Sequence, residues 1–417
     1  MAVAGPTRQV SDMNNMNIFR QLRDMTPSSS AHPRERSSPR RKKGGRQRIL
    51  LPLGCLVLLA VPFGLSWASL RWIQAGHLDH SAPGLVWERD LGNLSASRER
   101  PEISPRPMVI GTFHLPEILS VEDAVETEEG WVLLDSRLAK IHFLDPTSGQ
   151  LLSVGGEGPG PGELQDPVAL AVGDSHLWVL NQRGQTLDRF GPRGEFRERR
   201  RIHGGGCLVG LPKALLASPD GELLLLRVCP ATLPGPGTAF LEELARDGTL
   251  SPLLSLPLGR PGSRRLHLLR TPTASLGPGG LFLGTWDSPC VLELTGGSEP
   301  GGHRCLPEYE RPETEVEERG ALQRRFHRLG ELGLLPLDIP EHYPWYDRIF
   351  STAEGLVIRR MRGEEERDLV LLTHGAAPLV TPTWFPEDTF VGQETILSAE
   401  TLLEGTRIRV YENPLGA

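Results

Sequence analysis

The sequence lacks the short motifs that identify most enzyme classes. Its five cysteines include no Cys-x-x-Cys pair, which argues against a zinc ribbon and a thioredoxin-type redox site. It also has no Gly-x-Ser-x-Gly elbow, no His-Glu-x-x-His pair and no EF-hand loop. Histidines without metal-ligand spacing are expected to be structural or solvent-exposed: His142, His176, His203, His267 and His303. Aspartates at predicted turns are expected to cap backbone amides instead of binding calcium: Asp135, Asp145, Asp174 and Asp188. We therefore predict no catalytic, cofactor-binding or metal-binding residues.

Charge is distributed unevenly along the chain. Residues 1–48 contain eleven Lys or Arg and three acidic residues, a net charge of +8, whereas the remaining residues sum to −15. An acidic body lacks the positive face that nucleic acid requires, so no nucleic-acid partner is expected. A basic tail on an acidic body fits a membrane anchor better.

The basic tail leads into one long apolar run. Residues 1–48 are polar, without apolar periodicity, and are predicted to be a disordered cytoplasmic tail. Residues 49–70 carry no charge, and a helix of this length reaches roughly 33 Å, close to the thickness of a bilayer core. Lys and Arg resist translocation, so the cluster Arg40–Lys43 predicts a signal anchor with an exported body. The alternative is a signal peptide cut at Ser69.

The exported part begins with a polar segment, residues 71–106, which is predicted to be a linker or stalk. Beyond the membrane run, four cysteines remain in a compartment that permits disulfides. Four cysteines allow three pairings. Cys290 and Cys305 flank a predicted hairpin, so we favour a bridge between them, and a second between Cys207 and Cys229.

From about residue 108 the sequence repeats a theme of short apolar strands separated by turns. The two clearest copies contain Trp131 and Trp178, which are 47 residues apart, a usual blade length for propellers. Weaker copies include residues 220–225, 280–283, 354–358 and 395–411, which makes six in all. Isolated hairpins of this kind cannot bury their faces, and closure into a ring solves that problem. We predict an all-β, six-bladed β-propeller over residues 107–417, closed by pairing of residues 108–111 with the strand around Val410.

Between the two clearest copies lies a glycine-rich segment, Gly155–Pro167. Together with the strands around Trp178 and Arg189, it resembles the linker and following blade of NHL repeats. The chain as a whole resembles membrane-anchored bacterial six-bladed β-propeller proteins with NHL-like repeats. Glycines let such a linker cross from one blade to the next with positive φ angles. No Lys-Ser/Thr follows it, which argues against a nucleotide-binding loop.

One segment departs from the β pattern. Residues 313–332 place apolar side chains at roughly helical spacing, so we predict a helix inserted between the fourth and fifth blades. It either packs on the propeller or serves as a lid or partner-binding element.

The resemblance implies a location in a bacterial inner membrane, with the propeller in the periplasm. Scaffold features without catalytic motifs favour a non-enzymatic binding module for a protein, peptide or glycan ligand, without a cofactor. The alternative is a propeller-fold enzyme, a metal-dependent lactonase or hydrolase or a lyase, with its site at the central channel. A further possibility is that the tail signals while the propeller senses.

Overall fold

The computed structural model describes residues 96–415 except 184, 207–209, 219, 230–237, 259–265, 268–271, 278–279, 296–298, 310–336, 339–341, 363–366, 374, 384 and 387. The chain divides into two compact units, Met1–Pro83 and Gly84–Ala417, and every described residue belongs to the second. The expected tail, anchor and inserted helix lie outside the described residues. Within the described part, no helix has the length and apolar character needed to span a bilayer.

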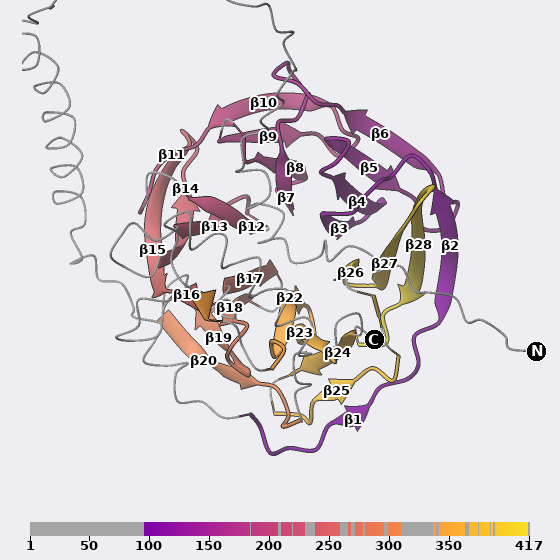
Figure 1. Cartoon of the computed structure of the whole chain (residues 1–417), viewed down its shortest axis with the longest axis vertical. Coiled ribbons are helices and arrows are strands. Elements are labelled where there is room, and N and C mark those ends of the chain that lie inside the picture. The colour runs from indigo at the N-terminus through magenta and orange to yellow at the C-terminus, as the bar shows by residue number, and fades with distance from the viewer. Residues whose placement is uncertain are drawn as a thin grey trace, which may run out of the picture. The chain divides into compact units, whose positions relative to one another are not determined.

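The strands form six radial sheets around one axis, and we number these blades 1 to 6 in chain order (Figure 1). Blade 1 consists of β3 (Asp123–Thr127), β4 (Gly130–Asp135), β5 (Lys140–Leu144) and β6 (Leu151–Gly155). Blade 2 consists of β7 (Pro167–Gly173), β8 (His176–Asn181), β9 (Thr186–Phe190) and β10 (Phe196–Arg201). Blade 3 consists of β12 (Leu211–Ala217), β13 (Leu223–Cys229), β14 (Thr238–Leu244), β15 (Thr249–Pro257) and, parallel to β15, β11 (His203–Gly204).

The remaining blades follow the same plan. Blade 4 consists of β17 (Pro272–Gly277), β18 (Gly280–Thr285), β19 (Cys290–Thr295) and β20 (Glu299–Cys305). Blade 5 consists of β22 (Tyr346–Thr352), β23 (Gly355–Met361), β24 (Arg367–Leu372), β25 (Leu379–Val380) and, parallel to β25, β1 (Glu102–Ile103). Blade 6 consists of β26 (Asp388–Val391), β27 (Thr395–Leu402), β28 (Gly405–Glu412) and β2 (Val109–Leu115). A separate parallel pair joins β16 (Leu266–His267) to β21 (Leu337–Asp338). The six-bladed β-propeller predicted from the repeats is confirmed.

Position within a blade explains the apolar pattern of each strand. The first strands of neighbouring blades contact one another, so each blade starts at the axis and ends at the rim. The second strands are packed on both faces by adjacent blades, and all seven residues of β23 are buried. Strands covered on both faces are mainly apolar, and the two buried arginines of β23 are paired with carboxylates. The rim strands β2 and β6 instead mix exposed and covered residues, because they are the outermost strands of their blades.

The ring closes by pairing strands from the two ends of the body. In blade 6, β2 pairs antiparallel with β28, in a register that places Gly111 opposite Val410 and Leu115 opposite Thr406. This is the closure that the sequence predicted. A shared core across blades 6 and 1 includes Ile408 and Trp131, and the Trp131 indole Nε1 donates to Thr395 Oγ1 at 2.8 Å. The closing pair therefore joins the last blade to the first.

The segment that leads into β2 lies along the rim of the ring, and its last two residues are the first two of β2. We call residues 96–110 the strap. The Ser97 amide donates to the Leu306 carbonyl at 2.8 Å, beside blade 4, and β1 then adds to β25 of blade 5 (Figure 1). Rim strands present unpaired backbone groups, and an added strand satisfies some of them. Part of the segment expected to be a stalk thus packs on the propeller.

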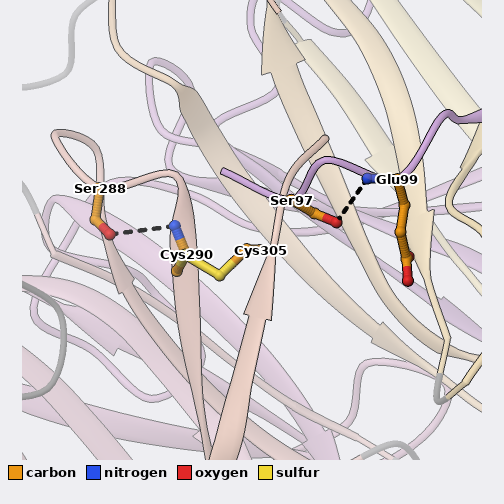
Figure 2. The surroundings of a disulfide bond; sticks show 5 residues. All are labelled: Ser97, Glu99, Ser288, Cys290 and Cys305. Carbon is orange, nitrogen blue, oxygen red and sulfur yellow. Dashed lines mark hydrogen bonds between the residues drawn. A yellow bond between two sulfur atoms is a disulfide. The ribbon is translucent and has the colours of Figure 1, made fainter. Parts of the chain in front are cut away.

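A disulfide fastens the two outer strands of blade 4 beside the strap. Cys290 and Cys305 are register partners in β19 and β20, with Cα atoms 4.0 Å apart, and their sulfur atoms are bonded (Figure 2). This is the pairing favoured from the sequence. Cys229 is also disulfide-bonded, and Cys207, its expected partner, lies outside the described residues.

The glycine-rich linker crosses from β6 to β7 in the conformation that the sequence indicated. Gly155, Gly156 and Gly162 have φ angles of 95°, 148° and 79°, in the region that glycine adopts without a Cβ penalty. Gly155 ends the rim strand of blade 1, and Pro167 begins the axial strand of blade 2. The segment is therefore scaffold.

Truncating a side chain in the closing blade should destabilise the whole ring. Ile408→Ala removes a fully buried side chain between blades 6 and 1 and is expected to cost about 3 kcal/mol of unfolding free energy. Leu403→Ala, in the exposed turn between β27 and β28, should change it by less than about 0.5 kcal/mol. Urea unfolding followed by near-UV circular dichroism measures both. Equal effects of the two substitutions would contradict closure by this blade.

Candidate functional site

The axial ends of the inner strands bring side chains from different blades together. Each blade begins with its inner strand, so all six inner strands start at the same end of the ring axis. We call that end the mouth. Charged residues lie here on three inner strands. Four occupy the first three positions of a strand, and a fifth directly precedes β3: Asp123, Lys213, Asp347 and Arg348, and Glu122.

Three inner strands carry an irregularity at this level. The register shifts between Pro167 and Ala169 in β7, between Pro212 and Ala214 in β12, and between Tyr346 and Arg348 in β22. A bulge inserts one extra residue and re-aims neighbouring side chains. The inserted residues include Lys213 and Asp347, so two of the charged groups at the mouth are placed by bulges.

Asp123 ties three blades together at the mouth. Its Oδ2 accepts from the Leu170 amide of blade 2 at 3.0 Å, and its Oδ1 accepts from the Arg348 guanidinium of blade 5 at 3.0 Å. Between blades 5 and 1 lies blade 6, whose Phe390 ring centroid is 4.6 Å from the Arg348 guanidinium carbon. The ion pair therefore reaches across the face of blade 6.

Burial dominates the electrostatics of this ion pair. Burial raises the pKa of the Asp123 carboxyl above its ordinary value, although Arg348 and the amides of Leu170 and Ala124 act in the opposite direction. The side chains of Arg348 and Asp123 nevertheless keep 29% and 20% of their surface accessible. Neither group is therefore fully withdrawn from solvent.

Lys213 has a different environment. Burial lowers the pKa of its amine to about 8, and the charge of Glu122 offsets only part of this effect. Among the described residues, no hydrogen bond or ion pair to the Lys213 amine is found. A half-buried ammonium group without a bonded counter-ion costs stability.

Asp347 shows the contrasting case of a fully compensated charge. Burial acts to raise its pKa, but Arg359 and Arg367 together hold that pKa below its ordinary value. The Nε atoms of these arginines lie 2.7 and 2.9 Å from its two carboxylate oxygens. Arg359 also donates to the Thr389 carbonyl of blade 6 at 2.8 Å. This network holds blades 5 and 6 together and is structural.

Among the histidines considered in the sequence, His142, His176 and His203 have hydrogen-bond partners and His303 is exposed. His142 is fully buried in blade 1, and its Nδ1 lies 2.8 Å from Ser153 Oγ. Burial lowers its pKa to about 4. His203 Nε2 lies 3.2 Å from Thr249 Oγ1 on the rim. In the described part of the chain, no three His, Cys, Asp or Glu side chains lie close enough together to hold a metal ion.

The aspartates at turns behave largely as expected. Asp135 accepts from the amides of Arg137 and Leu138, and Asp145 accepts from that of Thr147. Asp188 differs, because it lies in a strand and forms a two-point ion pair with Arg199.

The charged residues of the mouth were not predicted from the sequence. Their partners come from blades far apart in the chain, so no local motif connects them. One signal was present in the composition. Residues 49–417 contain only two lysines, Lys140 and Lys213, and their other permanently positive side chains are all arginine. An isolated lysine in an inner strand could have marked this position.

Comparison with known proteins supports the fold. No family model matches the sequence, and no curated protein matches it. A solved member of the DUF4221 family from Bacteroides vulgatus is similar over 76% of this chain and 98% of its own, with 11% identity and a TM-score of 0.52. A calcium-binding regucalcin from Agrobacterium tumefaciens covers 77% of this chain and 97% of its own, with 12% identity and a TM-score of 0.42. At such identities the likeness concerns the fold alone.

Removing the cation of the ion pair between Asp123 and Arg348 should destabilise the mouth. Arg348→Met leaves the enclosed Asp123 carboxylate without its counter-ion and is expected to cost about 2 kcal/mol. Adding Asp123→Asn should recover part of this loss, because the unpaired charge is then gone. Arg407→Met, which removes a more exposed pair with Glu400, should cost less than about 1 kcal/mol. Additive losses in the double variant would contradict the pairing.

The buried His142 predicts a loss of stability in acid. Its pKa is about 4 in the folded state and about 6.5 when unfolded, so the unfolded chain binds the proton first. The contribution of neutral His142 to the unfolding free energy is complete above pH 6.5 and falls by about 3 kcal/mol as the pH drops to 4. His142→Gln should flatten this part of the pH–stability curve, measured by urea unfolding. Parallel curves for the two proteins would show that His142 is not the titrating group.

Proposed function

We propose that this chain is a membrane-anchored, extracytoplasmic β-propeller with NHL-like blades, and that it binds its ligand at the mouth of the central channel. The proposal for the anchor comes from the uncharged run at residues 49–70 and the basic cluster before it. The location that follows is a bacterial inner membrane with the propeller in the periplasm.

The single observation that carries the binding role is the state of Lys213. Other enclosed charges at the mouth are compensated by bonded partners, such as Asp347 by two arginines. Lys213 has no bonded counter-ion among the described residues, and burial pulls its pKa down to about 8. A residue that costs stability without a structural return is typical of a functional site.

The chemistry of the mouth indicates what the ligand presents. At neutral pH the Lys213 ammonium group is mostly charged and can pair with an anionic oxygen. Arg348 is already held by Asp123 and Phe390, so it is less available to a ligand than Lys213. A carboxylate on a peptide, a protein loop or an acidic glycan supplies the missing partner of Lys213.

The alternative is an enzyme with its site in the channel, of the lactonase, hydrolase or lyase type. A metal-dependent reaction needs a set of ligands, and the described residues offer no such group. The Asp123 carboxylate is engaged by Arg348 and two amides. The binding role therefore has the stronger physical support.

Lys213→Met tests the proposal in two ways. Removing an uncompensated amine should raise the unfolding free energy at pH 7 by about 1 kcal/mol, after allowance for partial exposure. A panel of acidic peptides and uronic-acid oligosaccharides is screened for compounds that raise the melting temperature of the unsubstituted protein. Lys213→Met should abolish the thermal shifts that these compounds cause. Lys140→Met, at the only other lysine of the body, is the matched control and should keep those shifts.

The pH dependence has a defined sign. The Lys213 amine loses its proton as the pH rises through about 8, so affinity for an anionic ligand should fall above that value. Isothermal titration at pH 7 and pH 9 measures the difference. If Lys213→Met destabilised the protein and left the ligand-induced thermal shifts unchanged, the binding site would be overturned.

A further inference from the structure

The exposed apolar side chains of the described propeller concentrate in one segment. Ile103, Met108, Val109 and Ile110 keep 78%, 66%, 55% and 53% of their surface accessible. All four belong to the strap, within eight consecutive residues. Scattered exposed apolar residues are ordinary, whereas a continuous group of them marks an interaction surface.

The strap is also positively charged where it is exposed. Arg98, Arg100 and Arg106 are exposed, and no ion pair to them is found among the described residues. They outnumber the two acidic residues of the strap, Glu99 and Glu102. Apolar side chains interleaved with arginine match the boundary between lipid head groups and acyl chains, especially where the head groups are anionic.

The chain itself provides the means to bring this surface to a bilayer. The strap follows the uncharged run that ends at Leu70, and residues 71–95 lie between them. Twenty-five residues reach at most about 85 Å even when fully extended, so a membrane anchor at residues 49–70 would keep the strap within that distance of the lipid surface. Tethering raises the effective concentration of the second contact and favours it over a partner free in solution.

We propose that the strap docks the rim of the propeller onto the anionic surface of the membrane that anchors the chain. This inference rests on the proposed anchor and adds a second, peripheral contact. Ile103, Met108 and Ile110 enter the interface between head groups and acyl chains, and the three arginines contact lipid phosphates. Blades 5 and 6, whose rims carry the strap, then face the bilayer.

The test uses the full chain in nanodiscs that contain phosphatidylglycerol, with phosphatidylcholine nanodiscs for comparison. A Cys55→Ala background carries either Met108→Cys or Leu403→Cys, labelled with an environment-sensitive fluorophore. Leu403 is the matched control, since it is a fully exposed apolar residue in the same blade. It lies in the turn between β27 and β28, at the start of β28, whereas Val109 pairs with Tyr411 near the end of β28. Unsubstituted Cys55→Ala protein reports labelling elsewhere.

Spin-labelled lipids should quench the probe at position 108 and leave the probe at position 403 unquenched. Arg106→Gln should lower the docked fraction by up to about fivefold in anionic nanodiscs and have little effect in phosphatidylcholine. Equal accessibility of the two probes in both lipids would overturn docking while leaving the anchor intact. Protection of position 108 in detergent that increases with protein concentration would identify a second copy of the chain as the occupant. That result would also overturn docking on the membrane. Failure of the chain to enter nanodiscs would reject the anchor as well.

Discussion

The antiparallel contact between β2 and β28 joins strands from opposite ends of the body, and the other blades depend on it. Each blade has two apolar faces, and a single four-stranded sheet in water leaves both uncovered. In the ring every face is covered by a neighbour, provided that blade 6 also meets blade 1. The register of Gly111 with Val410 and the buried contact of Ile408 with the blade 1 core supply that cover.

Closure also assembles the mouth. Asp123 belongs to blade 1 and Arg348 to blade 5, and the blade between them is the one that β2 completes. A charge that is buried at the mouth needs a partner. Arginine meets this demand at Asp347, whose two carboxylate oxygens pair with Arg359 and Arg367. Lys213 stands apart because a lysine amine responds to burial by a lower pKa, which suits reversible pairing with a ligand.

The strap links these features to the N-terminal part of the chain. It contacts blades 4 and 5 before it continues as the closing strand of blade 6. One continuous segment therefore leads from the region of the expected anchor to the strand that closes the ring. Only two residues of β1 pair with blade 5, whereas β2 pairs along its length, so the first contact is much the weaker. Lipid contact by the strap would strengthen that first attachment.

The sequence by itself determined the fold class, the six repeats, the closing pair and the glycine linker, because each is written in a local pattern of apolar and turn-forming residues. The two tryptophans at blade spacing and the positive-φ glycines after β6 are examples. The mouth was decided only by the tertiary structure. Asp123, Lys213 and Arg348 come from blades 1, 3 and 5, and their relation depends on ring geometry and on bulges that no periodicity reveals. The course of the strap was likewise tertiary, because a polar segment shows no pattern of its own and takes its place from the free edges of blades 4 and 5.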